Sequence, residues 1–330
     1  MTRLLLLLIL SISLVLPIRA QEDNTPVCTS PLPELEATSE LMSVNGQSIS
    51  VEQFSNRVQF EQAYNTLKFA VRVEALANDA EAMASDSQIQ TINNENSDPS
   101  QLGNRVLGEL ARDVIIWEYA SANEIVVLSA DLTATIEDFF NITDEIPEER
   151  EIIIDDFNQR LLANGTTLSE ISTFFCRRTL YNLVQDTVIG ELETTLYINA
   201  DHILMSSQEV AQDIITLIEN GEDFATLAQE LSLDVASAER GGALGWQPAV
   251  FYIPAFATVA TEIDLNTLSA PVQTSFGWHI IRVNAREERP VEDELRDFVE
   301  ESLFTRWRNK QVSQAEITIN PEWQSFIPNS

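Results

Sequence analysis

Hydrophobic residues recur at intervals of three and four positions along most of the chain, and one central segment breaks that pattern. Between residues 41 and 195 this spacing places apolar side chains on one face of each segment, which predicts amphipathic helices. One helix is expected over about 102–122, and another is expected after Ser129. The pattern therefore predicts a mostly α-helical domain in the first part of the chain.

Two short motifs predict where helices of this domain begin. Ser50 with Gln53, and Thr167 with Glu170, have the spacing of a capping box, in which two side chains satisfy the free amides of the first turn. Residues 86–101 are rich in Asn, Ser and Gln, which predicts a mobile loop between two helices.

The pattern changes in the segment 196–285, where short β-like runs alternate with helices. Strands are expected at 198–204 and 278–283, and helices at 207–220 and 223–231. This arrangement predicts a compact module with a small mixed β-sheet and surrounding helices, so the fold class of the whole chain is α+β.

A last helix is expected near Pro290, within the C-terminal segment 286–330. Its apolar residues share one face: Val291, Leu295, Phe298, Val299, Leu303 and Trp307. Such a face is too apolar to stay in water, so we expect it to pack back on the N-terminal helices and complete the helical domain.

The N-terminus has the features of an export signal. Residues 1–20 combine Arg3 with a leucine-rich run that is short for a bilayer span, which favours a cleaved signal peptide, although an uncleaved membrane anchor stays open. Residues 21–40 are polar and Pro-rich and predict a flexible tether. We therefore expect an extracytoplasmic protein, where Cys28 and Cys176 have the chance to form a disulfide; whether their backbones approach closely enough stays open.

Composition excludes several classes of partner and cofactor. The 330 residues include 52 acidic and 19 basic side chains, and this net charge of −33 argues against a nucleic-acid partner. With two His and two Cys in the whole chain, a zinc finger or a multi-His metal site is not expected. We expect no metal and no cofactor.

Both histidines, His202 and His279, lie in the 196–285 module, on its first and last predicted strands. Those strands are often neighbours in a small sheet, so the two imidazoles are candidates for one site, although a single buried histidine is more often structural. Asp234 follows a predicted helix, where an acidic residue is usual. The module also has large apolar residues that are typical of a core: Leu244, Trp246, Tyr252, Phe256 and Phe276.

Taken in order, six stretches of this module resemble the parvulin family of peptidyl-prolyl isomerases. They are ADHIL at 200–204, GEDFATLA at 221–228, SLD at 232–234, GGALGW at 241–246, IPAF at 253–256 and LSAPVQTSFGWHII at 268–281. With the helical segments on both sides, the layout is similar to extracytoplasmic foldases of the SurA and PrsA kind.

The resemblance implies roles for individual residues. The catalytic network that it implies consists of His202, Asp234, Thr274 and His279. The apolar contacts to the substrate proline that it implies come from Leu244, Tyr252, Phe256 and Phe276.

The chain departs from the family pattern at a few positions. Tyr252 stands where Met is usual, Gln247 replaces a Phe, and Ala249-Val250 replaces an Arg-Gly turn. The stretch 205–209 after the first histidine has no positive charge, so a preference for phosphorylated substrates is not expected.

These features predict a prolyl isomerase that assists the folding of exported proteins, with unfolded or nascent X-Pro polypeptides as partners. Between 196 and 285, 11 acidic residues face only Arg240 and Arg282, so we expect clients with neutral or basic flanks. The alternative is a non-catalytic holdase that binds unfolded chains. A hydrolase that uses Cys28 or Cys176 is a more distant third.

Overall fold

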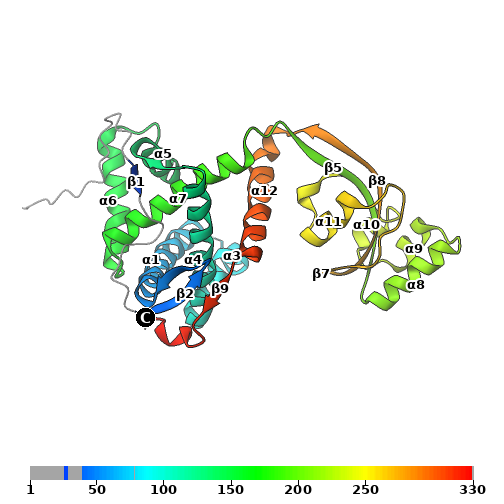
Figure 1. Cartoon of the computed structure of the whole chain (residues 1–330), viewed down its shortest axis with the longest axis horizontal. Helices are drawn as coiled ribbons and strands as arrows, with labels where there is room; N and C mark the ends of the chain where they lie inside the picture. The colour runs from blue at the N-terminus through cyan, green and yellow to red at the C-terminus, as the bar shows by residue number, and fades with distance from the viewer. Residues whose placement is uncertain (1–25, 29–38, 78, 329–330) are drawn as a thin grey trace, which may run out of the picture. The chain divides into compact units, whose positions relative to one another are not determined.

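The computed structural model describes residues 26–28, 39–77 and 79–328 and divides into two compact units (Figure 1). Residues up to Val184 group with the segment from Gln314 onward, and Gln185–Ser313 form the second unit. The predicted signal peptide at 1–20, and all of the predicted tether except 26–28 and 39–40, lie outside the described residues. Within the described part of the chain, no helix has the length and apolarity that crossing a membrane requires.

A three-stranded antiparallel sheet opens the helical unit, in the order β3-β2-β9. Strands β2 (Glu40–Val44) and β3 (Gln47–Ser50) form a hairpin, and β9 (Ile317–Ile319) pairs with β2 from the other end of the chain. Asn45 and Gly46 both have positive φ, as a tight two-residue hairpin turn requires. The first helix of the unit begins after this hairpin, at Val51, where the capping box of Ser50 and Gln53 predicted it.

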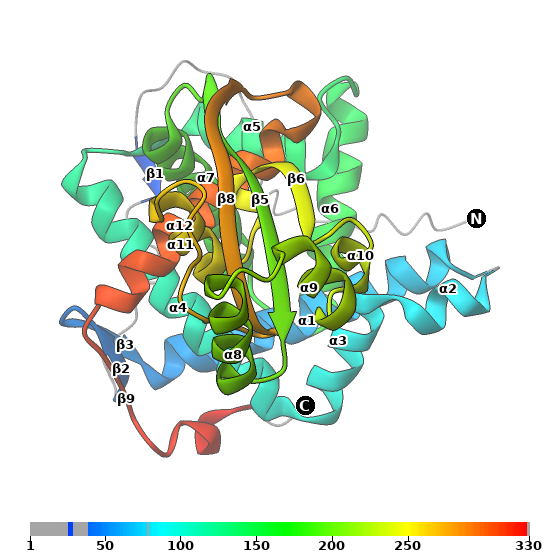
Figure 2. The same ribbon diagram turned by 90° about the vertical axis from the view of Figure 1, so that its right-hand side faces the viewer.

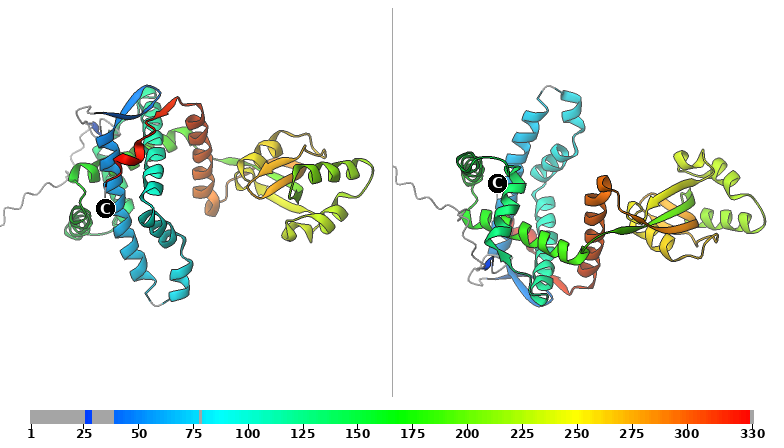
Figure 3. Two further views of the ribbon diagram at one scale, coloured as in Figure 1. Left: turned by 90° about the horizontal axis from the view of Figure 1, so that it is seen from below. Right: turned by 90° about the horizontal axis from the view of Figure 1, so that it is seen from above.

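Helices make up the rest of this unit, and Figure 3 shows α1 and α4 running side by side. The helices are α1 (Val51–Ala75), α2 (Ala80–Ser85), α3 (Ser87–Ser97), α4 (Pro99–Ala122), α5 (Ser129–Phe140), α6 (Pro147–Ala163) and α7 (Leu168–Ile189), the last of which continues into the second unit. The capping box of Ser50 and Gln53 is confirmed in both directions. An aromatic core that includes Phe60, Phe157 and Phe175 packs between α1, α6 and α7.

The predicted loop at 86–101 is instead helical. Asp86 accepts a hydrogen bond from the amide of Ile89 and starts α3, and Asp98 caps the amide of Ser100 at the start of α4. Glu95 of α3 is buried and accepts hydrogen bonds from Asn65 and Arg105. Polar composition suggested a loop, but these residues serve as helix caps and as buried partners of neighbouring helices.

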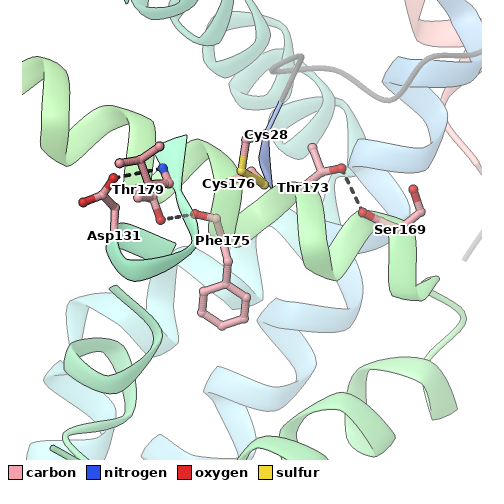
Figure 4. Close-up of a disulfide and its surroundings, with 8 residues drawn as sticks. Cys28, Asp131, Ser169, Thr173, Phe175, Cys176 and Thr179 are labelled. Atoms are coloured by element: carbon pink, nitrogen blue, oxygen red, sulfur yellow. Dashed lines mark hydrogen bonds between the residues drawn. A yellow bond between two sulfur atoms is a disulfide. The ribbon is translucent and has the colours of Figure 1, made fainter. Parts of the chain in front are cut away.

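A disulfide ties the beginning of the described chain to α7 (Figure 4). Cys28 ends the short strand β1 (Pro26–Cys28), which pairs with β4 (Val127–Leu128), and it bonds to Cys176 in α7 with the Cα atoms 5.8 Å apart. The question that the sequence left open is therefore answered, and residues 26–28 form a strand within the segment predicted as tether.

The second unit is built on a four-stranded antiparallel sheet in the order β6-β5-β8-β7. Its strands are β5 (Thr194–Met205), β6 (Ala243–Pro248), β7 (Val272–Thr274) and β8 (Gly277–Pro290), and Figure 2 shows β5 beside β8. Helices α8 (Gln208–Glu219) and α9 (Phe224–Leu231) pack on one face of the sheet, around Ile203 and Ile280. Helix α11 (Pro254–Glu262) and the 3-10 turn η1 (Ala249–Phe251) cover the opposite face, around Ile198 and Ile281.

Helix α12 (Asp293–Gln314) groups with this second unit for most of its length. Its residues Leu295, Val299 and Leu303 cluster with Val250 of η1 and with Leu192. The segment that returns to the helical unit is β9, through its pairing with β2. Part of the apolar face that the sequence predicted therefore packs on the η1 turn.

Candidate active site

The two histidines lie on adjacent central strands, as their positions in the sequence predicted. In the register of β5 and β8, His202 is opposite Ile281 and His279 is opposite Leu204, so the imidazoles form a diagonal pair on one face of the sheet. Their Nδ1 atoms are 3.0 Å apart, the rings are stacked, and both residues are 5% exposed. This pair forms the buried floor of the site.

Asp234 reaches His202 because its loop is tied to the end of β5. The amide of Leu233 donates to the carbonyl of Leu204, and the amide of Leu204 donates to the hydroxyl of Ser232. These two bonds place Oδ2 of Asp234 2.7 Å from Nε2 of His202. Asp234 precedes the short helix α10 (Val235–Ala238).

Gly242 lets the chain after α10 approach the strand at the same place. It has a φ of +86°, its carbonyl accepts from the amide of His202, and a Cβ there would lie 2.5 Å from the His202 carbonyl oxygen. A side chain at this position would therefore push the loop away from the strand that holds His202.

Thr274 approaches the other end of the pair from the turn between β7 and β8. Its hydroxyl is 2.8 Å from Nε2 of His279 and accepts a hydrogen bond from the amide of Phe276. The turn closes at Gly277, whose φ is +135° and whose Cβ, if present, would lie 2.5 Å from the carbonyl oxygen of Met205. The four polar residues predicted from the sequence thus form one continuous chain of hydrogen bonds.

The donor and acceptor of each hydrogen bond in this network follow from Asp234, because a carboxylate only accepts hydrogen bonds. His202 therefore donates from Nε2, which leaves its Nδ1 to accept from the Nδ1–H of His279. Nε2 of His279 is then an acceptor, and it receives the hydroxyl proton of Thr274. This assignment gives each ring nitrogen of the two imidazoles a hydrogen-bond partner.

Ser237 is a fifth member of the network, and the sequence analysis missed it. Its hydroxyl donates to Oδ2 of Asp234 at 2.6 Å and lies 3.0 Å from Nε2 of His202, and the residue is 1% exposed. The available signal was its position three residues after Asp234, at the start of a helix, where a short hydroxyl side chain reaches back to a carboxylate.

Burial and hydrogen bonding act differently on the two ends of the network. Burial, aided by the nearby His202, lowers the pKa of His279 to about 4, so this ring is neutral at pH 7. Burial would raise the pKa of Asp234, but hydrogen bonds from Ser237 and His202 outweigh it and hold that pKa below its ordinary value. At pH 7 the two ends of the network therefore differ, with a neutral imidazole at His279 and a negative carboxylate at Asp234.

An apolar wall stands beside the imidazoles. Phe256 is 2% exposed, and its ring makes edge contacts with both His202 and His279. Tyr252 stacks on Phe256 with ring centroids 4.6 Å apart, and Leu244 packs in the same cluster. We refer to Leu244, Tyr252 and Phe256 as the proline wall.

Two features of this region differ from a simple apolar surface. Burial, with Asp201 nearby, raises the pKa of Tyr252 to about 12, and its hydroxyl is buried with no hydrogen-bond partner among the described residues. Phe276, predicted to contact substrate, is 69% exposed; its backbone amide, which bonds Thr274, is what joins it to the site.

The PPIC-type PPIase domain of the rotamase family matches residues 202–285, which span this network and wall. Over the longer chain, the foldase protein PrsA of Oceanobacillus iheyensis is 30% identical across 257 residues, covering 69% of this chain and 86% of the relative. The chain belongs to the PrsA-like foldases. Their parvulin-type isomerase domain lies here within the second unit, at residues 202–285.

Other comparisons are shorter or more distant. A parvulin-like PPIase of Rickettsia conorii is 36% identical over 138 residues, which are 40% of this foldase and 49% of the relative, so the match spans about half of that protein. The crystal structure of PrsA from Bacillus anthracis covers 67% of this foldase and 97% of its own chain, at 21% identity and a TM-score of 0.40.

No metal site accompanies the imidazole pair within the described ranges. There, no group of three or more His, Cys, Asp or Glu side chains is arranged to hold an ion. In this foldase each ring nitrogen of the pair is instead directed at a hydrogen-bonding neighbour from the protein.

Proposed function

We propose that this foldase accelerates cis/trans isomerisation of X-Pro bonds in unfolded exported polypeptides. The observation that carries the proposal is the juxtaposition of a closed hydrogen-bond network, from Thr274 through both histidines to Asp234, with the apolar proline wall. The network supplies a rigid polar side, and the wall supplies a surface for the pyrrolidine ring.

The reaction breaks no covalent bond, so it needs no nucleophile. Its barrier of roughly 18–20 kcal/mol comes from amide resonance, which is lost when the C–N bond twists. The planar amide is the more charge-separated form, so neutral imidazoles and aromatic walls stabilise it less than water does and favour the twisted amide. In this proposal Tyr252 and Phe256 hold the ring while the neutral His202–His279 pair lies beside the rotating bond.

The charge of the module indicates which clients it takes. Of its two arginines, Arg282 is paired with Asp201 at 2.7 Å and stacks over Phe224, so it adds little free positive charge. A module with 11 acidic residues repels acidic segments and attracts basic ones at low salt. We therefore propose clients whose residues beside proline are neutral or basic, and equal turnover of Glu-Pro and Lys-Pro peptides at low salt would contradict this part.

Export is part of the proposal. The signal-like sequence at 1–20 and the Cys28–Cys176 disulfide both favour a compartment outside the cytoplasm, where disulfides persist. Cleavage of the signal would release the protein, whereas an uncleaved segment would anchor it. Mass spectrometry of the mature N-terminus separates these two outcomes.

A second candidate is holding of unfolded chains without catalysis. An open groove of about 600 Å³ in the helical unit favours it, because its lining includes Tyr64, Phe139, Phe140 and Phe157. Aromatic side chains of this kind suit apolar segments of an unfolded polypeptide.

The deciding experiment is NMR exchange spectroscopy of a short X-Pro peptide with the mature chain and with a His202→Ala, His279→Ala double variant. We expect the mature chain to accelerate exchange and the double variant, checked for an intact fold by its two-dimensional spectrum, not to do so. If neither accelerates exchange and the mature chain still prevents aggregation of an unfolded client, holding replaces catalysis as the function.

A further inference from the structure

The proline wall is held from behind by α12, a helix outside the matched isomerase domain. The guanidinium of Arg306 directs Nη2 at three carbonyl oxygens, those of Ala249, Val250 and Tyr252, at 3.2, 3.1 and 2.9 Å. These carbonyls belong to the 3-10 turn η1 and the residue that follows it. The end of such a turn leaves carbonyls without an internal partner, and a cation there satisfies them.

Two side-chain contacts strengthen the same attachment. Val250 is 7% exposed and packs against Val299, which is fully buried. Phe251 meets Phe298 edge to face, with ring centroids 4.8 Å apart. Three consecutive residues, 250 to 252, are therefore each held by α12.

The guanidinium of Arg306 binds these carbonyl oxygens without competition from a nearby carboxylate of the described residues. In the part of the chain that the structure describes, no carboxylate lies within 4.0 Å of its guanidinium, whereas Arg296 on the same helix has Asp293 and Glu300 at 3.8 Å. Burial lowers the pKa of Arg306, which fits a guanidinium whose partners are carbonyls. An Arg with carbonyl partners fixes backbone position more directly than one that is free to exchange between exposed carboxylates.

The held segment is also where this chain departs from the parvulin pattern. Ala249-Val250 stands in place of an Arg-Gly turn, and Tyr252 in place of Met. Val250 is the residue that enters the α12 interface, and Tyr252 is the one whose ring stacks on Phe256.

From these contacts we infer that Arg306 is a positioning residue for the isomerase site, setting the place of Tyr252 in the proline wall. The effect of Arg306 on catalysis rests on the proposed isomerase function. Its effect on peptide binding does not. Loss of Arg306 releases the Tyr252 backbone, the Tyr252 ring moves on Phe256, and the wall binds the pyrrolidine ring less well. The histidine network, which α12 does not touch through any of these contacts, keeps its geometry.

The test uses the full mature chain with Arg306→Met, which keeps an unbranched apolar stem and removes every side-chain donor. We expect affinity for an X-Pro peptide, measured by NMR titration, to fall about 5- to 10-fold, a loss of up to about 1.4 kcal/mol. The side-chain resonances of Tyr252 and Phe256 should shift, while the imidazole nitrogen shifts of His202 and His279 stay. Lys310→Met, which removes an exposed charge from the same helix, is the matched control and should change neither.

A double-mutant cycle with Tyr252→Met decides whether Arg306 acts through Tyr252. We expect the double variant to bind no more weakly than Tyr252→Met alone, whereas additive losses would overturn the inference. Unchanged affinity and unchanged Tyr252 resonances in Arg306→Met would also overturn it.

If Arg306→Met does not fold, Arg306→Lys takes its place, because it keeps one charged donor group. Its affinity for the X-Pro peptide should fall less than is expected for Arg306→Met. Binding and resonance shifts are measurable whether or not the wild-type chain accelerates exchange, so a failed proposed function would not be mistaken for a failed inference.

Discussion

The two units each contain a buried polar network, and the networks are built from opposite kinds of group. In the helical unit, Arg57 contacts Glu61, Glu109 and Asp113, and Arg105 contacts Glu61, Glu95 and Glu109. Arginine stays charged at any ordinary pH, and each of these partners is a carboxylate.

In the isomerase unit the network is made of imidazoles and hydroxyls, with one carboxylate at its end. The Asp234 side chain keeps 29% exposure, whereas the Arg57 side chain keeps 9%. Removing one member of a network of fixed charges leaves its partners buried and unpaired, so such a network holds helices together. A network of imidazoles and hydroxyls with an accessible end tolerates rearrangement of its hydrogen bonds, which suits contact with a substrate.

The largest effect that the comparison predicts is on stability, in the helical unit. Arg57→Met should lower the free energy of unfolding by about 3–5 kcal/mol, because it strands buried carboxylates. Urea unfolding followed by circular dichroism measures this. Arg160→Met, which breaks the exposed pair with Asp156, should cost less than about 1 kcal/mol. Equal costs for the two variants would show that the buried network is not the stabilising feature.

The next largest effect is a loss of stability that is confined to the helical unit. Replacing both Cys28 and Cys176 by Ser should destabilise the helical unit by about 2–5 kcal/mol, because the bond closes a long loop of the unfolded chain. Amide hydrogen exchange of Ile280 and Ile281 in the isomerase sheet should not change. Faster exchange at those strands would mean that the two units unfold together.

A smaller effect depends on pH and belongs to the isomerase unit. His279 has a folded pKa of about 4 against an ordinary 6.5, so between these values the unfolded state binds a proton that the folded state does not. Stability of this unit should therefore fall as pH drops from about 6.5 to about 4, by at most about 3 kcal/mol. Asp234, whose pKa is lowered, loses its stabilising effect only at lower pH.

Hydrogen exchange of Ile280 as a function of pH measures that loss. His279→Gln, which does not titrate, should flatten the profile between pH 6.5 and 4. A profile that is the same in the variant would assign the pH dependence to other groups.

The smallest effect concerns Ser237. Ser237→Ala removes a donor to the charged form of Asp234, so the pKa of Asp234 should rise toward its ordinary value. Carbon-13 NMR titration of the Asp234 carboxyl measures this, with Ser275→Ala, on the exposed β7–β8 turn, as the control. An unchanged pKa would remove Ser237 from the network.

Much of the site was predictable because its residues lie in a recognisable order along the chain. His202, Asp234, Thr274 and His279 were all identified from sequence, and the structure brings them within hydrogen-bond distance of one another. Ser237 was missed because a serine near a helix start is common, and only the neighbouring carboxylate and imidazole distinguish this one. Residues 86–101 were misassigned because the same Asp, Ser and Asn side chains favour both loops and helix caps.

By itself the sequence determined the isomerase module, its pair of histidines and the amphipathic helices, since each of these depends on residue order or on a local period. The tertiary structure decided three other features: the disulfide between Cys28 and Cys176, the pairing of β9 with β2, and the attachment of α12 to the turn before Tyr252. Each joins segments more than 50 residues apart in the chain. A local sequence pattern indicates that an apolar face or a backbone carbonyl needs a partner. Only the folded chain determines which distant segment provides that partner.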